Sequence, residues 1–184
     1  QEVALQGLPV RLCLDRAGVV GGDGAVHHGF CDIALLRTLP DAVICAAMDE
    51  ASLRGALDFM RTCDDGLSCV RYPRDDADGR FADAACPPFE RGKARCVRPV
   101  DAPDAFILGY GTMVMNAMDA AEALTDELQV EVWDARFAKP VDEAMLRRAL
   151  DAGVPVITVE DHSVVGGFGA ACLDKAAEAG VNTA

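Results

Sequence analysis

The chain has 184 residues, of which 51% are apolar, and its 30 acidic against 17 basic residues give a formal net charge of −13. This length suits one large domain or two small ones, with enough apolar material for a real core. The acidic balance disfavours general binding to nucleic acid or to an anionic membrane, and no stretch reaches the ~18 consecutive apolar residues that a membrane span needs. A phosphorylated ligand would therefore be held by a few placed cations.

The first half of the chain alternates short apolar runs with segments of helical spacing. Strands that alternate with helices in this way predict a parallel sheet. Asp49 is a plausible N-cap for the second of these helices, whose apolar face is expected at Leu53, Ala56, Leu57 and Met60. In chain order the predicted elements are a strand at 10–14, a helix at 30–39, a strand at 42–47, a helix at 49–62 and a strand at 68–72.

The second half repeats the same alternation after a stretch that breaks it. Residues 75–79 are acidic and loop-like, and four prolines punctuate the segment up to 103, of which 90–98 alternates enough to predict a strand. Thr112, Pro140 and the glycine run at 166–169 each precede a predicted helix. The elements expected here are strands at 105–108, 130–133 and 154–159 and helices at 112–127, 140–150 and 170–179.

These patterns predict an α/β chain in two parts. Residues 1–75 form the first unit, 76–103 an interdomain connection and 104–184 the second unit. The chain opens in what reads as the tail of a helix, without an initiator methionine, and stops where another strand could begin. We therefore expect it to be a fragment of a longer protein, with the second unit truncated.

The segment 15–29 is the most informative stretch because it mixes ionisable side chains with five glycines directly after a predicted buried strand. Glycines allow positive φ angles and a close approach of backbone to a ligand. Loops at the carboxyl ends of strands are where open α/β sheets bind ligands. The segment is therefore predicted to belong to a site for a small anionic molecule.

Arg16 and Arg74 each follow a predicted strand. A guanidinium group presents a fork of donors that suits phosphate oxygens, so two of them at one sheet edge could hold and orient a sugar phosphate. The alternative is a pair of surface ion pairs, with Asp15 or Asp75 as partners.

Asp23 and His27 are candidate catalytic residues in the same segment. Their four-residue spacing would bring them together if the loop turned helical near His27. Histidine can move a proton near neutral pH, and a carboxylate can fix its tautomer. A solvated loop histidine is the alternative. A metal site that adds His28 is conceivable, but neighbouring side chains point apart on most backbones.

The remaining candidates have simpler interpretations. The eight cysteines contain no C-x-x-C pair and are expected to be small core residues of a protein in a reducing cytoplasm rather than zinc ligands. The glycine run 166–169 could cradle an anion at a helix start, although it lacks the full G-x-G-x-x-G form. Glu160, Asp161 and His162 could be a catalytic cluster. We favour the alternative that they are a strand-end acid and a helix cap.

Several motifs, in order along nearly the whole chain, resemble the 1-deoxy-D-xylulose-5-phosphate synthase family, which is transketolase-like and depends on thiamine diphosphate. The loop at 15–29 is the most specific of them, since the motifs of the second half are shared by other transketolase-like enzymes. The motifs are Asp15-Arg16-Ala17-Gly18, Gly22-Asp23-Gly24-Ala25-Val26-His27-His28-Gly29, Val70-Arg71-Tyr72-Pro73-Arg74, Gly109-Tyr110-Gly111-Thr112, Asp134-Ala135-Arg136-Phe137-Ala138-Lys139-Pro140 and Val159-Glu160-Asp161-His162.

The resemblance implies a fold, a reaction and site roles. Residues 1–75 would be the C-terminal part of a pyrimidine-binding domain with a parallel sheet, and 104–184 a transketolase C-terminal-like domain. The family's enzymes are cytoplasmic homodimers that use Mg²⁺ and condense pyruvate with glyceraldehyde 3-phosphate, releasing CO2, to supply isoprenoid, thiamine and pyridoxal synthesis. By position, Arg16 and Arg74 would clamp the phosphate of glyceraldehyde 3-phosphate, and Asp23 and His27 would contact substrate and assist proton transfer.

The resemblance also shows what the chain lacks. The family's diphosphate- and Mg²⁺-binding domain and the Glu that activates the cofactor have no counterpart here, so no cofactor or metal ligand is assigned. The fragment alone is expected to be inactive and not to bind thiamine diphosphate tightly. The alternatives are another transketolase-like enzyme, the β subunit of a 2-oxoacid dehydrogenase, or a module that serves only dimerisation.

Overall fold

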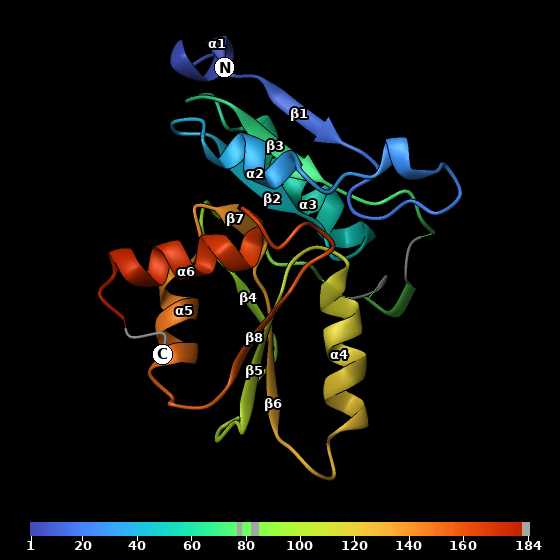
Figure 1. The fold of residues 1–184 in the computed structure, drawn as a ribbon, viewed down its shortest axis with the longest axis vertical. Coiled ribbons are helices and arrows are strands. Elements are labelled where there is room, and N and C mark those ends of the chain that lie inside the picture. Colours follow the sequence, from blue (N-terminus) through green and yellow to red (C-terminus); the bar gives the residue numbers. More distant parts are fainter. Residues whose placement is uncertain (77–78, 82–84, 182–184) are drawn as a thin grey trace.

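A computed structural model of the chain describes residues 1–76, 79–81 and 85–181. Residues 77, 78 and 82–84 of the predicted connection, and 182–184 at the predicted truncation, lie outside the described residues. Two four-stranded sheets form the centre of the molecule, one above the other in the view of Figure 1. The prediction of an α/β chain with mainly parallel sheets is confirmed.

The first sheet has the strand order β1-β3-β2-β7. Its first three strands run parallel, and β7 pairs with β2 in the antiparallel direction. Helices α2 and α3 contribute to two different core clusters, which places them on opposite faces of the sheet. The elements of this part are α1 (Glu2–Leu5), β1 (Arg11–Leu14), the 3-10 turn η1 (Ala25–His27), α2 (Asp32–Arg37), β2 (Val43–Ala46), α3 (Glu50–Arg61), β3 (Ser68–Arg71) and a second 3-10 turn, η2 (Gly79–Phe81).

The second sheet has the order β4-β6-β5-β8, with β5 parallel to both neighbours and β4 antiparallel to β6. Helix α4 lies on one side of it and α5 and α6 on the other (Figure 1). Its elements are β4 (Arg95–Arg98), β5 (Ala105–Gly109), α4 (Met113–Ala123), β6 (Val130–Asp134), α5 (Glu143–Leu150), β8 (Val156–Val159) and α6 (Phe168–Glu178); β7 (Phe137–Lys139) leaves this half to join the first sheet.

Strand β7 joins the two halves of the molecule. Its backbone pairs Lys139 with Ile44 and Phe137 with Cys45, across a register shift. The Phe137 ring is fully buried and packs edge-on against the Phe59 and Phe89 rings, with centroids 5.4 and 5.8 Å away. The largest core cluster likewise contains residues of both sheets. Sequence reasoning did not predict β7, because three residues between a loop and a proline carry too little periodicity.

The predicted helix 49–62 is observed as α3, with a capping box. The Asp49 carboxylate accepts from the Ser52 N–H at 2.7 Å, and the Asp49 N–H donates to the Ser52 hydroxyl at 2.9 Å. Ala56 and Met60 are buried as predicted. The prediction that Leu57 belongs to the buried face is wrong, because its side chain is 41% exposed. Position 57 lies one residue off the stripe that α3 turns toward the sheet. Thr112 stands at the N-cap of α4, yet its side chain makes no capping hydrogen bond.

Asp142 is the N-cap of α5 and is 5% exposed. Its carboxylate accepts from the N–H groups of Ala144 at 2.8 Å, Met145 at 3.3 Å and Ala94 at 2.8 Å, so it joins a helix end to the chain before β4. Replacing Asp142 with alanine leaves these buried donors without an acceptor, and we expect the free energy of unfolding to fall by about 2 kcal/mol. Urea denaturation measures the change. Asp142→Asn keeps an acceptor oxygen and should recover about half of the lost stability. An alanine variant as stable as the wild type would contradict the role of Asp142 as a cap.

Asp134, at the end of β6, is fully buried, and its burial raises the pKa of this carboxyl to about 6 although Arg136 opposes the shift. Its Oδ1 accepts from the Arg136 N–H at 3.1 Å, whereas Oδ2 lies 3.6 Å from Arg136 Nε and has no hydrogen-bond partner. The pKa of an aspartate in an unfolded chain is about 4. Between about pH 4 and 6 the folded chain therefore keeps a proton that the unfolded chain has lost, so this group makes stability fall as pH rises through that window.

Asp134→Asn is expected to remove that contribution. The free energy of unfolding of the variant minus that of the wild type should rise from pH 4 to pH 6 and then stay level. Denaturation of both proteins at a series of pH values measures the difference, and the comparison cancels the opposite trend of the other carboxylates. A difference that stays constant across the window would show that Asp134 does not titrate there.

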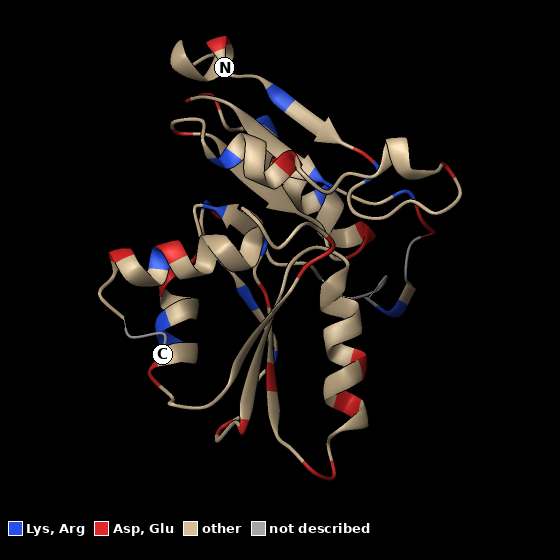
Figure 2. Ribbon diagram, viewed as in Figure 1, with Lys and Arg blue, Asp and Glu red and all other residues tan. Residues whose placement is uncertain are grey.

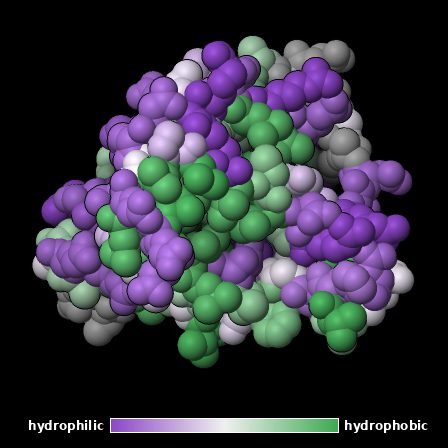
Figure 3. All heavy atoms as spheres, turned by 90° about the horizontal axis from the view of Figure 1, so that it is seen from above, coloured by the Kyte–Doolittle hydropathy of each residue, from purple (hydrophilic) through white to green (hydrophobic). Residues whose placement is uncertain are grey.

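Acidic segments are spread over both halves of the ribbon in Figure 2, consistent with the net charge. Seen from above, Figure 3 shows hydrophobic surface framed by hydrophilic residues. Within the described ranges, the helices are all too short or too polar to cross a bilayer. The large exposed apolar side chains of the N-terminal half are Leu5, Leu8, Val19, Val26, Phe30, Leu35 and Leu57.

Candidate active site

The four residues predicted from the sequence come from two neighbouring strands. The loop 15–29 follows β1, and Arg74 follows β3. Strands β1 and β3 pair in parallel, with Leu14 opposite Arg71, so the chain leaves both strands at the same edge of the sheet. The predicted arrangement of the two arginines at one sheet edge is therefore observed.

Asp23 is the point on which both guanidinium groups converge. Arg16 Nε donates to Asp23 Oδ2 at 2.7 Å, and Arg74 Nη1 lies 3.0 Å from Asp23 Oδ1. Arg16 also pairs with Asp15 through Nη1, as the surface-pair alternative foresaw. Arg74 takes Asp23 rather than the predicted alternative Asp75. Each guanidinium carries five N–H donors, and these contacts use only some of them, so both arginines keep donors for an anion.

The electrostatics of the loop follow from these contacts. The hydrogen bond from Arg16 lowers the pKa of Asp23, with Arg74 acting in the same direction, so Asp23 is an anion at neutral pH. Asp23 in turn raises the pKa of Arg16. Arg16 has a φ of +60°, the left-handed region that side chains other than glycine rarely adopt and that costs roughly 1 kcal/mol. Such strain concentrates at functional sites, where the surrounding structure holds the residue in place.

His27 is close to Asp23, but through the backbone. The loop forms η1 at 25–27, and His27 Nδ1 lies 3.0 Å from the Asp23 carbonyl oxygen, not from its carboxylate. The predicted proximity is thus observed with a different acceptor. Since a carbonyl only accepts, this contact places the proton on Nδ1 and leaves the lone pair of Nε2 toward solvent. His27 is exposed.

His28 points the other way and serves the loop itself. Its Nδ1 accepts from the Val20 N–H at 3.0 Å, so His27 and His28 do not share a ligand. Across the described part of the chain, no group of three or more His, Cys, Asp or Glu side chains could hold a metal ion. The eight cysteines are free thiols, and four of them are buried; Cys13 and Cys31 are exposed, contrary to a general core role.

The glycine run at 166–169 holds an anion from the protein itself. The Glu160 carboxylate accepts from the Phe168 N–H at 2.5 Å and the Gly169 N–H at 2.9 Å. A Cβ at Gly167 would lie 2.5 Å from Glu160 Oε2, so the carboxylate can approach only because this residue is glycine. The preferred interpretation of Glu160 as a cap is supported, and it already uses the Phe168 and Gly169 amides at the start of α6.

Sequence reasoning missed a buried charged cluster beneath the loop. Arg71, 3% exposed, donates through Nε and Nη2 to the two oxygens of Asp32 at 2.6 and 3.1 Å. His162 Nε2 lies 3.5 Å from Asp32 Oδ1 and accepts from the Ile33 N–H at 3.3 Å. The available signal was an arginine at the end of an otherwise apolar strand, a position where a charge needs a partner.

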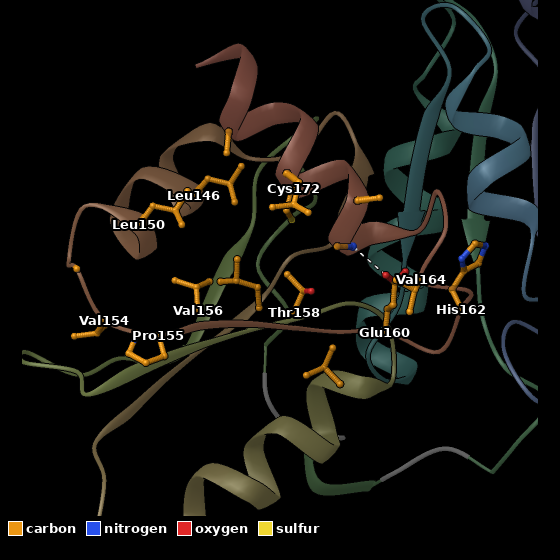
Figure 4. Close-up of a pocket in the computed structure, with 17 residues that line it drawn as sticks. Leu146, Leu150, Val154, Pro155, Val156, Thr158, Glu160, His162, Val164 and Cys172 are labelled. Carbon is orange, nitrogen blue, oxygen red and sulfur yellow. Dashed lines mark hydrogen bonds between the residues drawn. The ribbon is translucent and has the colours of Figure 1, made fainter. Parts of the chain in front are cut away.

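Neither of two large hollows in the described part of the chain is lined by Arg16, Asp23, His27 or Arg74. One, of about 840 Å³, lies between the ends of β2 and β3 and the start of α4 and is rich in acidic residues. The other, of about 760 Å³, runs along β8 under α5 and α6. Figure 4 shows its apolar side chains, Leu146, Leu150, Val156 and Cys172 among them, together with the polar side chains of Thr158, Glu160 and His162. Three of the four predicted residues thus lie on the loop 15–29, and the fourth, Arg74, lies directly after β3.

Two family models divide the chain between them. The transketolase pyrimidine-binding domain matches residues 1–78, and the transketolase C-terminal domain matches residues 92–184. Among curated proteins, the 1-deoxy-D-xylulose-5-phosphate synthase of Chlorobium phaeovibrioides is 38% identical over 99% of this chain. The synthase of Rhodopirellula baltica is 41% identical over 100% of this chain. The chain spans only 28% of the length of each.

Solved structures agree on the fold. A chain described as split gene transketolase, inactive beta4 tetramer, superimposes with a TM-score of 0.83 at 28% identity, over 95% of this chain and 55% of that one. A transketolase mutant from Pichia stipitis superimposes with a TM-score of 0.72 at 19% identity, over 89% of this chain and 25% of that one. The arrangement of the two halves is therefore the same in these proteins.

Proposed function

Because the chain belongs to the transketolase family, in which it comprises pyrimidine-binding and C-terminal domains, we propose that it forms the part of a 1-deoxy-D-xylulose-5-phosphate synthase that binds the phosphate of glyceraldehyde 3-phosphate. The observation that carries the proposal is the convergence of Arg16 and Arg74 on Asp23. Two guanidinium groups held by one carboxylate keep a fixed separation and orientation. A phosphate with three acceptor oxygens can bridge them through the donors they retain.

Asp23 and His27 have separate roles in this proposal. Asp23 orients the two arginines and fixes the His27 tautomer through its carbonyl oxygen. His27 then presents the Nε2 lone pair to a substrate hydroxyl, takes its proton, and can return that proton as an N–H donor. Both act by positioning and proton transfer on the acceptor, the contribution that a protein makes beside a cofactor.

Thiamine diphosphate supplies the carbanion chemistry in enzymes of this kind. The described residues offer no ligand set for Mg²⁺, and none of them is assigned to the cofactor. We expect the 184 residues alone to be inactive and not to bind thiamine diphosphate tightly. The chain that superimposes best of the two above is itself described as inactive, which supports this expectation.

Assembly and location are also proposals. The same neighbour is described as a tetramer, and exposed apolar side chains such as Val19, Val26 and Phe30 supply surface for association, so a homo-oligomer, in the simplest case a homodimer, is proposed. The free thiols fit a reducing cytoplasm. Pyruvate and glyceraldehyde 3-phosphate are the proposed substrates, supported by the names of the curated relatives.

A chimera tests the function directly. The matching segment of the Rhodopirellula baltica synthase, 41% identical, is replaced by this chain, and the purified chimera is assayed with pyruvate and glyceraldehyde 3-phosphate. CO2 release that requires both substrates is the expected result. A folded chimera that transfers a two-carbon unit from a ketose phosphate, or that decarboxylates pyruvate without an aldehyde acceptor, would favour one of the sister enzymes. If dimerisation persists while activity is indifferent to Arg16 and His27, the chain serves assembly alone.

A further inference from the structure

The loop that carries Asp23 and His27 is closed at its base by its own backbone. Gly18 and Gly29 exchange two hydrogen bonds, each of 2.9 Å, and Ala17 donates to the Tyr72 carbonyl oxygen at 3.0 Å. We call residues 17–20 and 28–30 the neck of the loop. Because residues 21–27 between the two parts of the neck are exposed, apart from the partly buried Asp23, the geometry of the loop depends on how the neck is held.

A segment from the other half of the molecule holds the neck through hydrogen bonds. The Val19 N–H donates to both oxygens of the Asp161 carboxylate, at 3.2 and 3.1 Å. On the other side of the neck, the Ser163 N–H donates to the Phe30 carbonyl oxygen at 3.2 Å. A Cβ at Gly18 would overlap the Asp161 carboxylate, and Gly18 has a φ of +79°, so only glycine permits this approach.

The segment that holds the neck is itself fixed by hydrogen bonds to its neighbours. Glu160, directly before Asp161, is fixed by the amides at the start of α6. Arg71 reaches both sides of the contact, since its Nη2 lies 2.9 Å from the Gly29 carbonyl oxygen and 3.4 Å from that of Asp161. A loop end held on two sides by anchored groups has few alternative conformations.

From this geometry we infer that Asp161 is a positioning residue for the phosphate site: from the C-terminal half, it holds the neck so that Arg16 and Asp23 face Arg74. The inference rests on the proposed function for the ligand, but the contact itself is independent of it. Arg16 lies two residues before Gly18 and keeps its strained backbone because the residues after it cannot move. Release of Val19 would let Arg16 relax and separate the two guanidinium groups.

Amide hydrogen exchange of the 184-residue chain tests the contact. Asp161→Ala should raise the exchange rate of the Val19 N–H by about 10-fold, the loss expected for a hydrogen bond to a charged acceptor. Asp161→Asn keeps one acceptor oxygen and should restore most of the protection. Asp174→Ala is the matched control, because it removes a carboxylate that bridges the two halves through Arg37 without touching the loop. Unchanged exchange at Val19 in Asp161→Ala would overturn the inference.

Titration with inorganic phosphate, followed at the Arg16 Nε–H resonance, separates positioning from a purely structural role. Asp161→Ala should weaken phosphate binding by about 5-fold or more, while Asp161→Asn and the Asp174→Ala control stay within about 2-fold of wild type. Gly18→Ala displaces the same carboxylate from the opposite side and should match Asp161→Ala if that variant fails to fold. Faster exchange with unchanged phosphate binding would make Asp161 structural only and overturn the inference.

The two failures are distinguishable. If the wild-type chain shows no saturable shift at Arg16 or Arg74, the proposed function is at fault, because Asp161 is intact in that protein. The Val19 exchange rate still decides whether Asp161 holds the neck, since that measurement needs no ligand.

Discussion

Replacing Arg71 with methionine is expected to lower the free energy of unfolding by about 3–5 kcal/mol, the largest change among the single substitutions considered. Arg71 is 3% exposed, and its removal leaves the Asp32 carboxylate, which is 20% exposed, without its bidentate partner. It also removes the donor to the Gly29 carbonyl oxygen at the neck of the loop. Urea denaturation of the chain measures the loss.

Two further variants make the result interpretable. Arg71→Lys retains the charge but not the planar fork, so it should lose less stability than Arg71→Met and provides a measurable variant if methionine prevents folding. The double variant Arg71→Met with Asp32→Asn removes both charges and should be more stable than Arg71→Met alone. If Arg71→Met denatures at the same urea concentration as the wild type, the Arg71–Asp32 pair does not stabilise the fold.

Arg16→Ala and Arg74→Ala are each expected to lower kcat/KM for glyceraldehyde 3-phosphate by about 10- to 100-fold in the chimera, the range for a lost hydrogen bond between charged groups. The loss should appear mainly as a higher KM for the aldehyde. Neither substitution should change the KM for pyruvate by a comparable factor. Steady-state assays with each substrate varied in turn provide the measurement.

The acceptor without its phosphate is the decisive control. With unphosphorylated D-glyceraldehyde, the wild type and both arginine variants should react at similar rates, because the group that the arginines bind is missing. Arg54→Ala removes an exposed arginine that pairs with Glu50 along α3, and it should leave both acceptors unaffected. An equal loss with and without the phosphate would show that the arginines act on something else.

Much of the fold could be predicted because its elements carry local signals. Strand β2 is a continuous apolar run, as expected for a strand buried on both faces, and Asp49 and Asp142 mark helix starts through their own side chains. β7 could not be found this way. Its place in the first sheet depends on a partner strand almost a hundred residues earlier, and no local periodicity records such a pairing.

The candidate site was predictable in its members and only partly in its contacts. The glycines around Arg16 and the strand before Arg74 indicated a shared sheet edge, which the structure shows. His27 contacts the Asp23 carbonyl oxygen because the chain forms the turn η1. The four-residue spacing alone does not specify which oxygen of Asp23 His27 meets. The role of Asp161 cannot be predicted from the sequence, because its contact with Val19 exists only once the two halves are packed.

Titration of the chain with glyceraldehyde 3-phosphate, with the Nε–H resonances of Arg16 and Arg74 followed together, tests the central claim most directly. Both arginines contact Asp23, and if they also share a phosphate their resonances should shift saturably with one common dissociation constant. Shifts at only one arginine, two different dissociation constants, or no saturable shift would show that the pair is a surface ion cluster and not a phosphate clamp.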